Sequence, residues 1–71
     1  MEKAYCIMMN SSNSWFPKEC QIIIKGGQDT LIQYEDYRDK TMKKRTVPSK
    51  YVFDCYQDAR AFITALYRQG R

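Results

Sequence analysis

Five cationic side chains lie within one short segment near the middle of the chain, and they are its strongest candidates for binding chemistry. They are Arg38, Lys40, Lys43, Lys44 and Arg45, and Asp39 is the one acid among them. Residues 38–45 therefore carry a net charge of +4, while the other seven basic and seven acidic residues of the chain cancel. Cations grouped in this way neutralise phosphates and release the counterions of nucleic acids.

Aromatic side chains lie near this basic segment at Tyr34, Tyr37 and Tyr51. Tyrosine hydroxyls contact phosphate or sugar, and tyrosine rings stack on exposed bases. We therefore expect a binding protein for DNA or RNA, with contacts from Tyr37, Arg38, Lys40, Lys43, Lys44, Arg45 and Lys50. The other interpretation is a long solvated turn, whose lysines keep the chain soluble and prevent pairing between sheet edges.

Trp15 and Phe16 form a second candidate site, because they follow a run of Asn and Ser that is typical of a loop. Tryptophan is enriched among the residues that contribute most to protein interfaces. An alternative function is thus a protein-interaction module, such as a small inhibitor or regulator encoded by a phage or mobile element. The two rings could equally fold back and cap a small core.

Catalysis and metal binding have little support in the residue types. The chain has no histidine, and its three cysteines, Cys6, Cys20 and Cys55, are widely spaced and odd in number. A zinc site normally needs four Cys or His ligands, and a disulfide framework needs an even count. We expect no enzyme, no metal and no cofactor, and reduced cysteines in a cytoplasmic protein. No apolar run approaches the length of a membrane span.

The elements that must position these residues begin with strands. Alternating or continuous apolar residues bounded by turn residues predict four of them: residues 3–9, 20–25, 30–37 and 47–53. Gly26 and Gly27 separate the second from the third and predict a hairpin there. The basic segment follows the third strand, so we expect it at an exposed hairpin tip.

One helix, residues 55–69, is predicted at the C-terminal end. Asp54 is a suitable N-cap, with Gln57 three residues later. Apolar side chains then recur with helical spacing and form one stripe: Ala59, Phe62, Ile63, Leu66 and Tyr67.

The predicted order is β-β-β-β-α within a single domain, residues 1–71. A lone amphipathic helix must pack on one face of an antiparallel sheet, which gives a small two-layer α+β domain with three to four strands. The other face, carrying Ile23 and Leu31, would be uncovered and could meet a ligand, a protein partner or a second copy in a homodimer. This layout resembles in architecture the arm-binding domains of phage integrases, which place a sheet face against a DNA groove; the resemblance implies DNA binding and assigns no residues.

Overall fold

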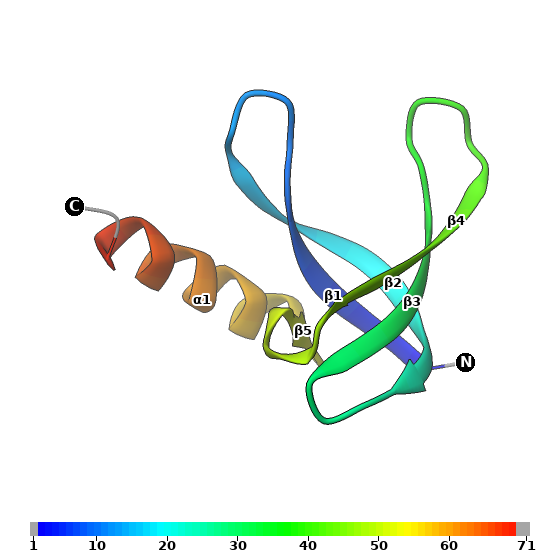
Figure 1. Ribbon diagram of the computed structural model, residues 1–71. Helices are drawn as coiled ribbons and strands as arrows, with labels where there is room; N and C mark the ends of the chain where they lie inside the picture. The colour runs from blue at the N-terminus through cyan, green and yellow to red at the C-terminus, as the bar shows by residue number, and fades with distance from the viewer. Residues whose placement is uncertain (1, 70–71) are drawn as a thin grey trace.

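The computed structural model describes residues 2–69, which form one antiparallel sheet and one helix (Figure 1). The sheet has five strands in the order β4-β3-β2-β1-β5. Their bounds are β1 Glu2–Met9, β2 Trp15–Lys25, β3 Asp29–Glu35, β4 Met42–Pro48 and β5 Val52–Phe53. A 3-10 turn, η1, spans Ser49–Tyr51, and the helix α1 spans Tyr56–Gln69. The predicted α+β class, an antiparallel sheet with a C-terminal helix, is confirmed, although the sheet has one strand more than the upper estimate.

The predicted fourth strand, residues 47–53, is wrong as a single element. Its first residues end β4, and η1 then carries the chain to the opposite edge of the sheet, where Phe53 of β5 pairs with Tyr5 of β1. Pro48 marks the break, with φ of −58°. Because proline has no N–H and a fixed φ, it favours the end of a strand.

The second strand begins five residues earlier than predicted, so Trp15 and Phe16 do not lie in a loop. They pair with Met9 and Met8 at the start of β2. Only residues 10–14 form the turn, in which the side-chain Oδ1 of Asn10 accepts the N–H groups of Ser12 at 2.9 Å and Ser14 at 3.0 Å. This local bonding satisfies the turn within a few residues, so strand pairing continues to the end of β1.

The basic segment also lies differently from the prediction. The tip of the β3–β4 hairpin covers residues 36–41, and the next residues, including Lys43, Lys44 and Arg45, belong to β4. The tip is closed by the Asp36 N–H, which donates to the Thr41 carbonyl at 2.9 Å. Because β4 is an edge strand, most of its side chains are exposed, three of the seven are charged, and apolar alternation does not mark it.

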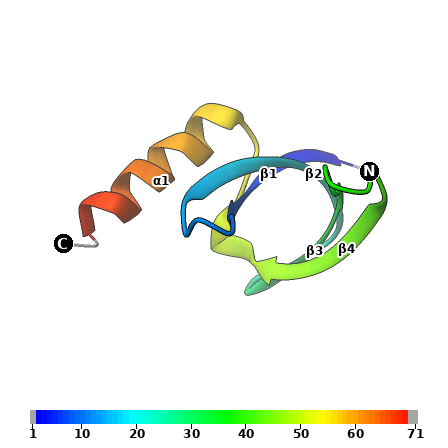
Figure 2. The ribbon, with the colours of Figure 1, turned by 90° about the horizontal axis from the view of Figure 1, so that it is seen from above.

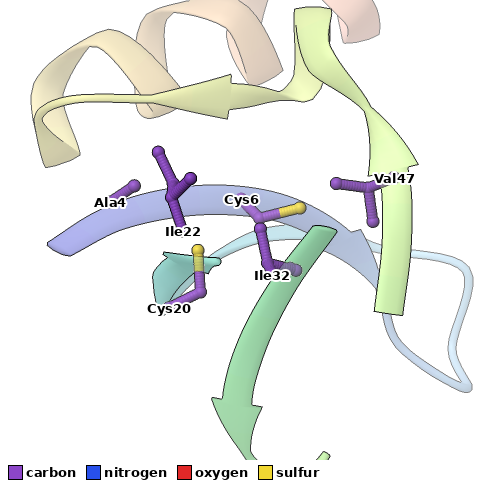
Figure 3. Close-up of a cluster of buried hydrophobic side chains, with 6 residues drawn as sticks. All are labelled: Ala4, Cys6, Cys20, Ile22, Ile32 and Val47. Atoms are coloured by element: carbon purple, nitrogen blue, oxygen red, sulfur yellow. The ribbon is translucent and has the colours of Figure 1, made fainter. Parts of the chain in front are cut away.

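Curvature of the sheet gives it two cores, one on each face. Figure 2 shows the strands curving around an interior while α1 lies outside it. The interior core draws buried side chains from β1, β2, β3 and β4, which Figure 3 shows: Ala4, Cys6, Cys20, Ile22, Ile32 and Val47. The concave face is therefore filled by the sheet itself, and the expectation of a whole uncovered face is wrong.

The second core lies on the convex side of β1, beneath the helix. Ile7 is buried there against Ala59 and Ile63 of α1, as the predicted helical stripe requires. Beyond the helix, the convex side carries the cross-strand pair Ile24 and Leu31. Ile24 is 63% exposed, because a register shift after Ile22 interrupts the alternation of β2.

Candidate nucleic-acid interface

The pairing of β4 with β3 decides where its cations point. Lys43 pairs with Tyr34, and Arg45 pairs with Ile32, which is a residue of the interior core. Directly paired residues share a face of an antiparallel sheet, so Lys43 and Arg45 lie on the concave side. Lys44 lies on the convex side. The basic segment therefore does not form one continuous surface.

Lys43 is held by the two acids of the hairpin tip. Its Nζ lies 3.0 Å from Oδ2 of Asp36 and 3.6 Å from Oδ2 of Asp39. The hydrogen bond to Asp36 raises the pKa of Lys43. The N–H of Arg38 and then Lys43 lower the pKa of Asp36, and the hydroxyl and N–H of Thr41 lower that of Asp39. Lys43 is thus paired with two carboxylates of the protein, although exposed ion pairs of this kind are weak.

The other predicted cations make no salt bridge within residues 2–69: Arg38, Lys40, Lys44, Arg45 and Lys50. Lys50 does not join the rest, because it lies in η1, beyond the end of β4 that is farthest from the tip. Its Nζ lies 5.5 Å from the centroid of the Tyr51 ring. Lys40 is at the tip, with a positive φ of 61°.

Figure 1 shows the tips of the β1–β2 and β3–β4 hairpins diverging from the sheet. Two of these cations, Arg38 and Arg45, border a cleft between the two tips. We call it the inter-hairpin cleft. Its volume is about 250 Å³. Its lining draws on both hairpins: Met8, Met9, Asn10, Ser11, Phe16, Lys18, Tyr34, Asp36, Tyr37, Arg38 and Arg45.

The base of the inter-hairpin cleft is apolar and its rim is cationic. Met8 and Tyr34 are half-buried and pack against the interior core, so they form the floor. Lys18, Arg38 and Arg45 are the lining cations, and Asp36 is the one lining acid. Because Asp36 is already paired with a lysine, three cations without a carboxylate partner surround a floor of aromatic and thioether groups.

Lys18 is the functional candidate that the sequence prediction missed. It lies on β2, opposite Cys6 of β1, and so faces the concave side. The prediction began this strand at Cys20 and therefore left Lys18 in a loop. The signal was present, because Phe16, Lys18, Cys20 and Ile22 alternate with period two in a longer strand.

Trp15 and Phe16, predicted together as a partner-binding site, are separated by the strand onto opposite faces. Trp15 packs in the core beneath α1, where its ring centroid lies 5.9 Å from that of Tyr51. Its backbone N–H donates to the hydroxyl of Tyr67 at 2.9 Å. Phe16 is half-buried and lines the inter-hairpin cleft. Trp15 therefore holds the helix to the sheet, and Phe16 belongs with the cations.

The remaining nucleophilic side chains are the three cysteines. Cys6 and Cys20 are buried in the interior core, and Cys55 is exposed. Burial raises the pKa of Cys6 to about 12 and that of Cys20 to about 11. Both thiols are therefore neutral near pH 7, and they are unreactive there because the thiolate is the reactive form. Within residues 2–69, no group of three or more Cys, Asp or Glu side chains could hold a metal ion.

Comparisons with known proteins found no matching family model, no matching curated protein and no matching solved structure. Among residues 2–69, no helix is long and apolar enough to cross a membrane. Functional inference for this chain therefore depends on the inter-hairpin cleft and its surroundings.

Proposed function

We propose that this protein binds nucleic acid through the inter-hairpin cleft and the adjoining tip of the β3–β4 hairpin. The observation that carries the proposal is the convergence of Lys18, Arg38 and Arg45 from two hairpins on one cleft. Lys18 is far from Arg38 and Arg45 in the sequence, and none of the three makes a salt bridge within the described chain. Cations held close together without carboxylate partners bind successive phosphates of a polyanion.

The hairpin tip extends this cationic surface. Lys40 lies at the tip, and the guanidinium of Arg38 lies 5.9 Å from the centroid of the Tyr37 ring. Tyr37 is 65% exposed. Arginine and tyrosine side by side can contact both the phosphates and the faces of bases. Lys43 has a supporting part in the proposal, because it orders the tip by binding Asp36 and Asp39.

A protein partner is the weaker proposal because its two predicted anchors do not act together. Trp15 is engaged in the core beneath α1, while Phe16 lies on the other face. A hot spot at a protein interface needs large side chains grouped on one accessible surface. The cations Lys18, Arg38 and Arg45, in contrast, line one cleft.

The proposal is tested by the salt dependence of binding to fluorescently labelled DNA and RNA of mixed sequence. The triple variant Lys18→Gln, Arg38→Gln, Arg45→Gln removes the cleft cations. We expect the slope of log affinity against log salt to fall by about 2 to 3, because each neutralised phosphate contributes about 0.7 to 0.9. At about 50 mM salt the affinity should fall by about ten-fold or more.

A matched control removes three cations elsewhere: Lys25→Gln, Arg60→Gln, Arg68→Gln. These residues are exposed and do not line the cleft. Both triple variants lose three positive charges, so they have the same net charge. We expect the control variant to keep most of the affinity and slope. Equal losses in the two variants would show that only net charge matters, and the absence of binding by the unaltered protein would refute the proposal.

A further inference from the structure

The inter-hairpin cleft has features that phosphate binding alone does not need. A phosphate site requires cations or N–H groups, whereas the floor of this cleft is formed by Met8 and Tyr34, with Phe16 and Tyr37 also in the lining. Aromatic and thioether side chains are suited to contact with flat, weakly polar rings. The cleft therefore offers an apolar surface directly beside its cations.

A double helix cannot use this apolar surface, because its bases are stacked and only their edges are open in the grooves. Bases of a single strand have free faces and stack on aromatic side chains. The position of the aromatic residues inside a cationic cleft thus favours a single strand over a duplex.

We infer that the inter-hairpin cleft receives an unstacked base of single-stranded nucleic acid, an inference that rests on the proposed function. Phe16 and Tyr37 provide aromatic surface for the base. Lys18 and Arg45, on facing hairpins, contact the phosphates on either side of it. Contact through base faces is tolerant of sequence, so the protein should show only modest base preference.

The test compares the affinities of the full-length protein for oligothymidine, oligouridine and a duplex of equal length, about 12 nucleotides per strand. All are measured by fluorescence anisotropy at the same salt. A second comparison uses a thymidine trinucleotide and the same trinucleotide with an abasic residue in its centre. The abasic residue removes the only base that has a phosphate on either side, and it keeps every phosphate. The variants are Tyr37→Ala and Phe16→Leu, with Tyr56→Ala as a control because Tyr56 is an exposed tyrosine outside the cleft.

We expect single strands to bind at least about five-fold more tightly than the duplex, with a similar loss from the abasic residue, from Tyr37→Ala and from Phe16→Leu. The abasic residue should have little further effect in the Tyr37→Ala variant, because base and ring act as one contact. Tyr56→Ala should bind as the unaltered protein does. The comparison of oligothymidine with oligouridine shows which of these two single strands the cleft binds more tightly.

Equal binding of single strands and duplex, without loss from the abasic residue or from Tyr37→Ala, would overturn the inference and leave the proposed function intact. Binding to none of the three nucleic acids would overturn both. Circular dichroism and thermal melting of each variant separate a lost contact from a lost fold. Tyr37→Ala keeps the test valid if Phe16→Leu does not fold, since Tyr37 is 65% exposed.

Discussion

Individual side chains show that a run of charge in a sequence is not a run of available charge. Lys43 lies between Asp36 and Asp39, at 3.0 Å and 3.6 Å, whereas Arg45 makes no salt bridge in the described chain. Two residues of the same segment thus differ in what they can offer a ligand. The missing member of the group, Lys18, comes from another hairpin, and only strand pairing brings it to the cleft.

The cysteines give a prediction at the residue scale. At about pH 8, iodoacetamide should modify Cys55 rapidly in the folded protein and should leave Cys6 and Cys20 unmodified. Cys55 is exposed, whereas burial keeps the other two thiols protonated at that pH. Mass spectrometry of the labelled protein should show one adduct, and three after unfolding. Rapid triple labelling of the native protein would show that the interior core is open to solvent.

The same thiols also set a pH dependence. Their pKa values are raised from 9.0 on folding, so the unfolded chain loses these protons first. Their contribution to the free energy of unfolding is therefore complete below about pH 9 and falls as the pH rises toward about 11 and about 12. Urea unfolding at a series of pH values from about 8 to about 11 measures this decline, and a constant free energy of unfolding over that range would contradict it.

At the scale of elements, the sequence predicts the helix and strands that have a clear apolar periodicity, and it misses those without one. The stripe through Ala59 and Ile63 predicts α1 within a residue at each end, and the apolar residues of the first predicted strand, 3–9, predict β1 equally closely. The start of β4 is not predicted, because at this edge position all but one of its residues are exposed and no apolar alternation marks them. The curvature of the sheet also escapes, because it depends on long-range packing among strands.

The β2–β3 turn gives a prediction based on two neighbouring glycines. A Cβ on Gly26 would overlap the carbonyl oxygen of Asp29, whereas a Cβ on Gly27 would meet nothing within 4 Å. Neither glycine has a positive φ, so space, and not backbone conformation, separates them. Gly26→Ala should lower the free energy of unfolding by more than about 1 kcal/mol, and Gly27→Ala should raise it by about 0.4 to 1 kcal/mol.

Urea unfolding followed by circular dichroism measures both variants under the same conditions. The Gly26 carbonyl also accepts the Ser49 hydroxyl at 2.7 Å, which ties this turn to η1. A displaced Gly26 should therefore loosen the connection between β4 and β5 as well. Equal stability of the two variants would contradict this account of the turn.

In the whole molecule, the candidate site lies at the end of the sheet where the two hairpin tips extend beyond both cores. The interior core fills the concave face, and the helix covers the convex side of β1. The hairpin tips extend beyond both, and the cleft lies between them with Met8 and Tyr34 joining its floor to the core. A ligand in the cleft therefore meets a floor that packs against the interior core.

The most direct test of the central claim locates bound nucleic acid on the protein by NMR. Amide chemical shifts of ¹⁵N-labelled protein are followed during titration with an oligothymidine of about 12 nucleotides. We predict that the largest changes fall on the cleft, at Ser11, Lys18, Tyr37 and Arg45, while Ile24 and Arg60 barely shift. Changes centred on the convex side or on α1, or no changes at all, would contradict the account.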